Sequence, residues 1–248
     1  MGDEKRSRTA AALIVGNELL SGKVQDENVT ALAKTLRGLG IRFERVVMVQ
    51  DDVDVIAGEI RDLSARHTVV FTSGGVGPTH DDLTVAGVAK AFGVPVVRNE
   101  WMASMLRAHY RERCTDGHLC MAQIPEGAEL ATNVEVTWPA VIMRNVWLLP
   151  GVPEIFRMKL ALLRDRLGGD APFVSRSVYT KMDEGDLKPL LDRVVAAHPT
   201  VEVGSYPKWS DPSYRTKLTF DGQDGGLVES AVEEFLRLLP AGEPQRTE

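Results

Sequence analysis

The sequence contains few cysteines and aromatic residues, and it has no long apolar segment. Among 248 residues there are only two cysteines, Cys114 and Cys120, and a Cys-x5-Cys pair fits no common zinc-binding spacing. Two cysteines are too few for a disulfide framework, so we expect both to be free thiols in a cytoplasmic protein. No run approaches the ~20 apolar residues that a membrane-spanning helix needs. The charged segment Met1–Arg8 leads straight into a strand-like stretch, which argues against a signal peptide.

An excess of positive charge is also missing. The chain has 29 basic and 35 acidic residues, for a formal net charge of −6. Such a balance argues against a general nucleic-acid-binding or anionic-membrane-binding surface, although it leaves room for a local basic pocket. With 44% hydrophobic and 26% charged residues, the composition is that of a soluble globular protein. We therefore expect neither nucleic acid nor a membrane as a partner.

Strand-like apolar runs alternate with helical spacing in the first two thirds of the chain. The pattern predicts strands at Thr9–Val15, Phe43–Val49 and His67–Thr72, and helices at Asn28–Leu39, Val53–Arg66 and Asp82–Phe92. Because the connections are short, a parallel, doubly wound α/β sheet is the simplest arrangement. Further on we expect a helix at Trp101–Arg113, mostly loop with a few strand-like residues over Gly117–Leu130, and a strand at Ala140–Leu149 with a possible partner around Asn133–Val136. A helix is expected at Glu154–Leu167.

The pattern changes after the segment Gly168–Pro172, which has the composition of a linker. Beyond it we expect strands at Phe173–Thr180, Val201–Tyr206 and Tyr214–Phe220, helices at Asp186–Ala197 and Leu227–Leu239, and a frayed tail of eight residues. This β-α-β-β-α order indicates a small α+β domain. The expected domains are therefore residues 9–168 and 172–240.

The most informative motif is the glycine-rich segment Thr72–Thr84, directly after a buried strand. Gly74, Gly75 and Gly77 allow a tight turn that brings backbone N–H groups close to an anion. The next helix presents its positive N-terminal end to the same place, which is where open α/β sheets bind ligands. We therefore predict a phosphate site that also includes Ser73, Thr79 and Thr84. The alternative is a plain tight turn in which Asp81 or Asp82 caps the helix.

The adjacent carboxylates Asp81 and Asp82 are candidate metal ligands. On the first turn of a helix neighbouring side chains diverge by ~100°, so one of them could bind Mg²⁺ while the other caps the helix. Mg²⁺ commonly takes one or two protein carboxylates together with phosphate oxygens of the substrate. The expected cofactor is accordingly a divalent metal, Mg²⁺.

Other candidate residues follow neighbouring strands and should reach the same edge of the sheet. They are Gly16, Asn17, Glu18, Ser21, Asp26 and Asn28 after the first strand, Asp51 after the second, and the turn residues Pro150 and Gly151. Polar groups in these loops could converge on a ligand. The alternatives remain open: Asp26, Asn28 and Asp51 could be helix caps, and the Pro-Gly turn could be a rigid connector.

Four separated motifs together resemble a known family. They are Gly16-Asn-Glu-Leu-Leu-Ser-Gly, Gln25-Asp-Glu-Asn28, Ser73-Gly-Gly-Val-Gly-Pro-Thr-His-Asp-Asp-Leu-Thr84 and Leu149-Pro-Gly-Val-Pro153. In this order they resemble the competence/damage-inducible protein A (CinA) amino-terminal family, within the wider molybdopterin-binding (MoaB/Mog) superfamily. The likeness covers roughly residues 9–165, and the tail resembles the small KH-like domain of CinA-type proteins.

The resemblance implies a three-layer α/β/α domain with a mostly parallel sheet, followed by a small α+β (KH-like) domain. It also implies a small-molecule nucleotide or molybdopterin ligand and a homo-oligomer, for which Trp101–Arg113 offers an amphipathic surface. The KH-like part lacks a Gly-x-x-Gly loop with basic flanks, so RNA binding is not supported.

For activity, the CinA branch implies divalent-metal-dependent hydrolysis of a nucleotide diphosphate such as ADP-ribose, with Asp82 and Asp51 as catalytic residues. The Mog branch implies adenylyl transfer to molybdopterin. A third hypothesis is a non-catalytic binding protein, because Asn17 stands where the family usually has a carboxylate.

Overall fold

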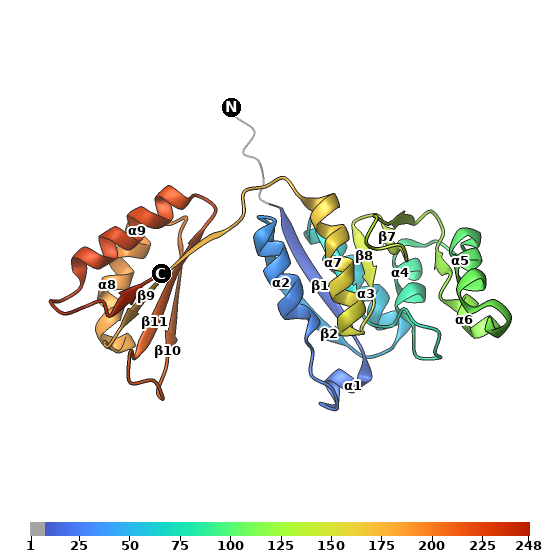
Figure 1. Ribbon diagram of the computed structural model, residues 1–248, viewed down its shortest axis with the longest axis horizontal. Helices are drawn as coiled ribbons and strands as arrows, with labels where there is room; N and C mark the ends of the chain where they lie inside the picture. Colours follow the sequence, from blue (N-terminus) through green and yellow to red (C-terminus); the bar gives the residue numbers. More distant parts are fainter. Residues whose placement is uncertain (1–7) are drawn as a thin grey trace. The chain divides into compact units, whose positions relative to one another are not determined.

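The computed structural model describes residues 8–248 (Figure 1). The chain divides between Asp170 and Ala171 into two compact units, here called the large unit and the small unit. No helix within the described part is long and apolar enough to cross a membrane.

The large unit is built on a six-stranded sheet that is mostly parallel, as expected. In spatial order its strands are β2 (Arg42–Val49), β1 (Thr9–Val15), β3 (Val69–Ser73), β8 (Val146–Leu149), β7 (Ala140–Met143) and β6 (Glu129–Ala131). The pairs β2–β1, β1–β3 and β3–β8 are parallel, whereas β8–β7 and β7–β6 are antiparallel.

Helices cover both faces of this sheet, giving three layers. On one face lie α2 (Asn28–Gly38) and α7 (Pro153–Leu167); on the other lie α3 (Val53–Arg66), α4 (Thr84–Phe92) and α5 (Glu100–Tyr110). Strand β1 shows why. Its residues alternate between the two cores, with Ala12 and Ile14 in one and Leu13 and Val15 in the other. A strand buried on both faces must be apolar throughout, as Thr9–Val15 nearly is.

The strand expected over Ala140–Leu149 is instead a hairpin of β7 and β8. The chain reverses at Arg144 and Asn145, where Arg144 adopts a left-handed backbone with φ of 54°. Asn145 anchors the turn, donating through Nδ2 to the carbonyls of Ser64 and His67 at 3.0 and 2.9 Å. Because Arg144 and Asn145 are only two polar residues within an apolar run, the sequence pattern did not predict this turn. The expected partner strand at Asn133–Val136 is also wrong, because β6 pairs with β7.

The segment expected to be mostly loop, Gly117–Leu130, is more ordered than its pattern indicates. It contains part of α6 (Asp116–Cys120), β5 (Gln123–Pro125), which pairs with β4 (Val96–Arg98), and the start of β6. Thr115 caps α6, accepting from the backbone N–H of His118. Strands of three residues are too short to show alternation, so periodicity could not reveal them.

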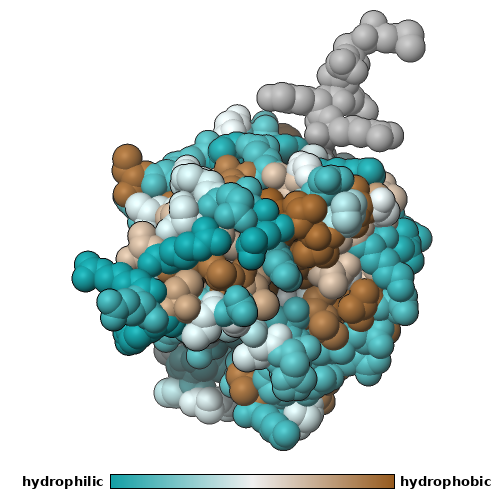
Figure 2. Space-filling model, turned by 90° about the vertical axis from the view of Figure 1, so that its right-hand side faces the viewer, coloured by the Kyte–Doolittle hydropathy of each residue, from teal (hydrophilic) through white to brown (hydrophobic). Residues whose placement is uncertain are grey.

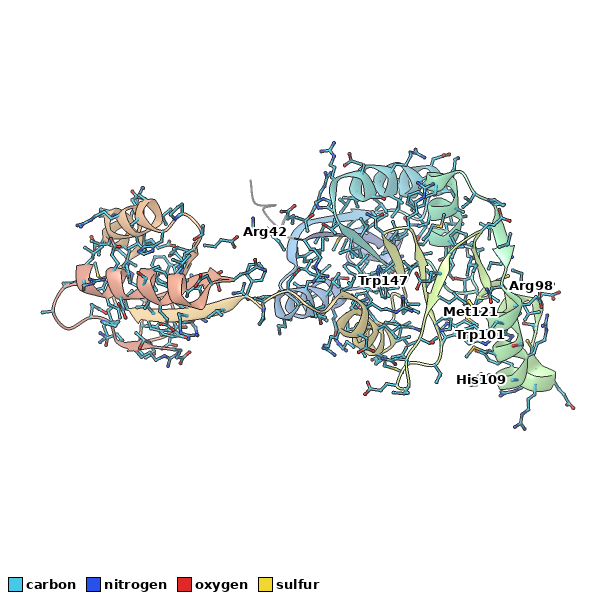
Figure 3. The ribbon with its side chains drawn as sticks, turned by 90° about the horizontal axis from the view of Figure 1, so that it is seen from above. Arg42, Arg98, Trp101, His109, Met121 and Trp147 are labelled. Carbon is cyan, nitrogen blue, oxygen red and sulfur yellow. The ribbon has the colours of Figure 1, made fainter. Side chains whose placement is uncertain are left out.

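The helix expected over Trp101–Arg113 is α5 followed by a 3₁₀ turn at Arg111–Arg113. Its residues Met102, Ala103 and Leu106 are buried in the core of the large unit, so the apolar face is used internally. Trp101 remains half exposed at the outer end, unlike the buried Trp147 (Figure 3). On the face shown in Figure 2 apolar side chains lie in patches separated by hydrophilic ones.

The small unit is a four-stranded antiparallel sheet packed against two helices, so its α+β class is as expected. The strand order is β10 (Glu202–Pro207), β11 (Thr216–Gly222), β9 (Val174–Thr180) and β12 (Arg246–Thr247), and the helices are α8 (Glu184–Ala197) and α9 (Gly225–Leu238). The expected frayed tail is wrong at β12, which pairs with β9 while Tyr179 donates its hydroxyl to Glu248 at 2.8 Å.

Helix α7 buries Lys159, which has no carboxylate partner among residues 8–248. Lys159 is only 3% exposed and donates to the carbonyl of Trp138. Burial lowers the pKa of Lys159 from 10.5 to about 8. The unfolded chain therefore keeps a proton between pH 8 and 10.5 that the folded chain has released, so stability should rise with pH across this window.

We expect urea unfolding at pH 9.5 to give a free energy about 2 kcal/mol larger than at pH 7 through Lys159 alone. The Lys159→Met variant should lose this increment, because methionine fills similar space without titrating. An identical pH dependence in the two proteins would mean that Lys159 stays protonated, or is solvated, in the fold.

Candidate functional site

The loops that follow β1, β3 and β8 meet at the carboxyl edge of the parallel sheet. Gly74 donates its N–H to the carbonyl of Leu149 at 3.2 Å, and a Cβ on Gly151 would lie 3.2 Å from the Cα of Gly74. Beside them, Gly16 donates to the carbonyl of Val49 at the end of β2. This is the edge at which open α/β sheets bind ligands.

Asn28 ties three of these loops together. Its side chain is 3% exposed, and Nδ2 donates to Ser73 Oγ at 2.9 Å and to the carbonyl of Gly151 at 2.8 Å. Its Oδ1 is buried without a hydrogen-bond partner in the described structure. The helix-capping alternative belongs to Asp26 instead, which accepts from the N–H of Val29 at 2.9 Å. Asn28 is thus the residue that holds the loops in register.

The glycine loop has a shape that only glycine permits at two positions. Gly74 and Gly75 have φ of 98° and 65°, in the left-handed region. A Cβ on Gly74 would overlap the carbonyl oxygen of Val15, and one on Gly75 would overlap Thr84 Oγ1. Thr84 is fully buried and donates this hydroxyl to the carbonyl of Gly74 at 2.8 Å. Thr84, predicted as a ligand residue, therefore uses its hydroxyl to hold the backbone of the glycine loop.

Three consecutive amides of this loop have no protein acceptor. In residues 8–248, no hydrogen bond uses the N–H groups of Gly75, Val76 or Gly77, although all three residues are half-buried. Amides without a partner on the chain are available to water or to a ligand, and successive free amides in a glycine-rich turn form a common type of anion-binding concavity. Helix α4 begins at Thr84, seven residues after Gly77, and adds the positive end of its dipole.

Asp82 closes the loop and does not cap the helix. Its Oδ2 accepts from the N–H and the hydroxyl of Thr79 at 2.7 and 2.5 Å, while the helix starts two residues later than predicted. A Cβ on Gly77 would lie 2.7 Å from Asp82 Oδ2, so this carboxylate borders the unpaired amides. Asp81 is exposed.

A second polar cluster lies at the ends of β1 and β2. Asp51 Oδ2 accepts from the N–H of Asn17 at 2.9 Å, while its neighbour Asp52 is the cap of α3. The carboxylate of Glu18 folds back on Gly16, where a Cβ would lie 2.5 Å from Glu18 Oε1. Ser21 is different: its hydroxyl donates at 3.1 Å to the carbonyl of Glu18, inside its own turn.

These acidic groups do not form a metal cage. Among the described residues, no group of three or more His, Cys, Asp or Glu side chains is placed to hold a metal. His80 is almost fully exposed and lies 3.9 Å from Asp81. Asp81 and Asp82 could therefore hold a divalent cation only if phosphate oxygens and water supplied its remaining ligands, as is common for Mg²⁺.

Fold and site together define an α/β protein whose ligand site is built from turns at the carboxyl edge of its sheet. Residues 11–168 match the family described as probable molybdopterin binding domain, and the chain belongs to this family. Residues 172–248 match a second family, described as the middle domain of FAD synthase. The family that the small unit matches is thus more specific than the KH-like class to which the sequence analysis compared it.

Several proteins are similar to the chain over most of its length. A protein of Archaeoglobus fulgidus is 33% identical over 229 residues, covering 91% of this chain and 95% of the relative. The probable FAD synthase of Caenorhabditis elegans is 30% identical over 262 residues, covering 94% of this chain. The chain spans 50% of the length of that relative.

A solved structure confirms the resemblance to CinA. The crystal structure of CinA from Thermoplasma acidophilum, described as a protein of unknown function, has a TM-score of 0.60 and 31% identity. The match covers 65% of this chain and 98% of the CinA chain.

Proposed function

We propose that the large unit binds the diphosphate of a nucleotide at the glycine loop and hydrolyses it. The observation that carries this proposal is the run of unpaired amides at Gly75, Val76 and Gly77. Fixed donors in a half-buried loop stabilise negative charge without having to reorganise, which is how charge developing on a phosphoryl group is stabilised. The lock between Thr84 and Gly74 keeps these donors in place.

In the proposed reaction, water adds to one phosphorus and the bridging P–O bond breaks. ADP-ribose would give AMP and ribose 5-phosphate, with one water consumed. Asp82, bordering the amides, is the group that we expect to position the water, and Asp51 and Glu18 lie beside the neighbouring loop. Asp82 and Asp81 are the carboxylates that would hold Mg²⁺, and this ion would neutralise diphosphate charge.

The relatives widen the choice of substrate. Because 94% of the chain aligns with a protein named probable FAD synthase, FAD joins ADP-ribose as a candidate. Both are dinucleotide-type diphosphates that release AMP on hydrolysis, so the same loop could serve either. FAD would give AMP and FMN.

A second candidate function is binding without turnover. Asn17 carries no charge, and the described structure has no group of three acidic or metal-binding side chains, so a bound metal would depend on Asp81 and Asp82 alone. Adenylyl transfer to molybdopterin remains the other enzymatic alternative. In it ATP would transfer AMP to the phosphate of molybdopterin and release pyrophosphate, and the new diphosphate bridge would lie at the same loop.

A thermal-shift panel with the full chain tests the proposal. ADP-ribose, FAD, NAD, ATP and molybdopterin are each added with and without Mg²⁺, and AMP serves as the monophosphate control. A ligand at 100 times its Kd should stabilise the fold by ~2.7 kcal/mol, which raises Tm by several degrees. We expect the diphosphates to raise Tm only when Mg²⁺ is present, and we expect AMP to have little effect.

Product analysis then separates the functions. AMP released from ADP-ribose or FAD supports hydrolysis, adenylylated pterin supports the transferase, and a shift without product supports the binding protein. If no diphosphate shifts Tm, the glycine loop is not a phosphate site and the proposal fails.

A further inference from the structure

A cavity of about 220 Å³ lies between two helices of the large unit, away from the glycine loop. It is lined by residues of α2 and by one residue of α7: Lys34, Thr35, Gly38, Leu39 and Arg164. Thr35 follows Asn28, which holds the loops of the proposed site, by seven positions along α2. A helix rises about 1.5 Å per residue, which places the cavity roughly 10 Å from those loops. It is therefore a separate site that the proposed function does not use.

Two cations line this cavity without a carboxylate partner. Within residues 8–248 neither Lys34 nor Arg164 makes an ion pair, whereas Arg166, two residues further along α7, pairs with Glu129 at 2.5 Å. Their own helices offer no partner either, because no acidic residue stands three or four positions from Lys34 or Arg164. Like charges that border one hollow repel each other, and an anion bound between them is attracted by both.

Thr35 contributes a hydroxyl that the fold does not use. The residue is 8% exposed, and no hydrogen bond among the described residues involves its hydroxyl. The hydroxyl of Thr84 shows the contrast, because it donates to the carbonyl of Gly74 at 2.8 Å. Buried hydroxyl groups are normally hydrogen-bonded, so one that lines a cavity is satisfied by water or by a ligand there. Thr35 thus adds a hydrogen-bond donor to the two positive charges.

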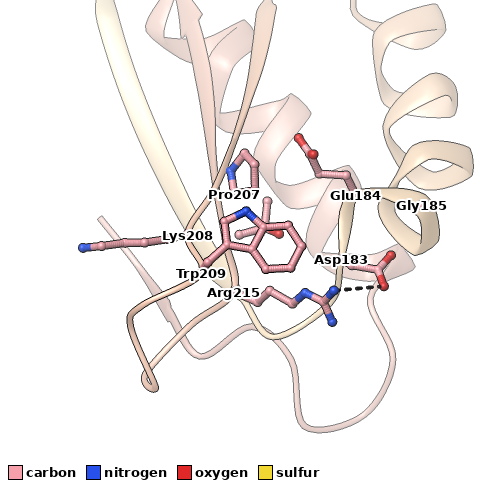
Figure 4. Close-up of a pocket in the computed structure, with 8 residues that line it drawn as sticks. Asp183, Glu184, Gly185, Pro207, Lys208, Trp209 and Arg215 are labelled. Atoms are coloured by element: carbon pink, nitrogen blue, oxygen red, sulfur yellow. Dashed lines mark ion pairs between the residues drawn. The ribbon is translucent and has the colours of Figure 1, made fainter.

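The charged groups that line the cavity of the small unit, in contrast, have partners of their own (Figure 4). There Asp183 pairs with Arg215 at 3.7 Å, and Glu184 accepts from Ser205 at 2.6 Å. The remaining wall includes the exposed indole of Trp209, which does not indicate what that cavity binds. The cavity between α2 and α7 does indicate a ligand, because its charges are of one sign and are not paired within the described chain.

We propose that the cavity between α2 and α7 binds a small, doubly charged oxyanion such as phosphate. Lys34 offers a compact ammonium group, Arg164 offers a planar guanidinium that matches two phosphate oxygens, and Thr35 offers a hydroxyl donor. Two positive charges on neighbouring helices favour a dianion over a singly charged carboxylate. The volume is below the roughly 300–1,000 Å³ typical of sites for drug-sized ligands, so the cavity suits phosphate or a phosphorylated compound of a few carbon atoms and is too small for a nucleotide.

Inorganic phosphate is the probe, and its Kd is taken from the dependence of Tm on phosphate concentration at an ionic strength held constant with chloride. The glycine loop is itself a proposed phosphate site, so every variant is measured alone and in combination with Gly75→Ala. We expect Lys34→Met and Arg164→Met each to raise Kd about fivefold or more, because each removes one charge-assisted contact. Arg61→Met is the matched control and should leave Kd unchanged, since Arg61 is an exposed arginine of α3 with no ion pair in the described chain.

A second pair of variants supplies the negative charge from the protein itself. A Cβ on Gly38 would have no neighbour within 4 Å, so a longer side chain can enter the cavity from this position. Gly38→Glu brings a carboxylate to Lys34 and Arg164, and Gly38→Gln fills the same space without charge. We expect Gly38→Glu to raise the Kd of phosphate at least about tenfold and Gly38→Gln to raise it less. Acetate, which carries one charge, should give no saturable rise in Tm.

Several results would overturn the proposal. Equal Kd values for the unchanged chain, Lys34→Met and Arg164→Met would show that phosphate binds elsewhere, and equal effects of Gly38→Glu and Gly38→Gln would show that charge is not what the cavity selects. If phosphate has no saturable effect, Arg164 only offsets the negative end of its helix. Loss of binding with Gly75→Ala alone would place the phosphate at the glycine loop. Retention there keeps this test independent of the proposed function, and a cooperative melt of each variant shows that its fold is intact.

Discussion

Replacing Asp82 by asparagine is expected to lower the rate of AMP release about a hundredfold while Tm barely changes. Asparagine can still accept the hydrogen bond from the N–H of Thr79, so the structural cost should stay below about 1 kcal/mol. The lost charge borders the amides that would hold phosphate, and a hundredfold change in rate equals ~2.7 kcal/mol of transition-state stabilisation. Rate and Tm are measured on the same preparations.

The matched control for this prediction is Asp116→Asn, which removes one exposed carboxylate from the first turn of α6. Its rate and Tm should both stay near those of the unchanged chain. If Asp82 holds Mg²⁺, added Mg²⁺ should restore part of the activity of Asp82→Asn. Parallel losses of Tm and rate would instead make Asp82 a purely structural clamp of the loop. Full activity would transfer its proposed role to Asp81, Asp51 or Glu18.

Replacing Gly75 by alanine is expected to reduce the diphosphate-induced thermal shift to about half or less. The backbone at Gly75 has φ of 65°, and the new Cβ would overlap Thr84 Oγ1. Relief requires breaking the bond from Thr84 to the carbonyl of Gly74, which would displace the amides. We expect stability to fall by roughly 1–3 kcal/mol and diphosphate affinity to fall about tenfold or more.

Gly58→Ala provides the control for this substitution. Gly58 lies inside α3, and a Cβ there would have no neighbour within 4 Å. Alanine in a helix interior should stabilise the protein by about 0.5–1 kcal/mol and leave diphosphate binding intact. If Gly75→Ala keeps the full thermal shift, the amides of the loop do not bind phosphate and the site must be sought elsewhere.

Local signals were sufficient where one segment decides its own structure. The strand Thr9–Val15 and the helix Val53–Arg66 have the bounds that their apolar spacing predicts. A buried strand shows a continuous apolar run, and an amphipathic helix repeats every 3.6 residues. The order of these elements also predicted the mostly parallel sheet and hence the edge at which the loops meet.

The roles of the site residues depended on contacts between distant parts of the chain. Asn28 reaches residues 45 and 123 positions away, so its spacing could not separate a helix cap from a bridge between loops. The same holds for Asp51, which binds the N–H of Asn17, and for the tail, whose order comes from pairing with β9.

The sequence by itself determined the parallel, doubly wound sheet and the position of the glycine loop, because periodicity and glycine content are properties of short segments. Only the tertiary structure decided which hydrogen-bonding groups of the loop have partners within the protein. Asp82 is held by Thr79, the hydroxyl of Thr84 is committed to Gly74, and the three amides between them are left unpaired. Hydrogen bonds join residues that are distant in the sequence, so the groups that remain free for a ligand can be identified only from the folded structure.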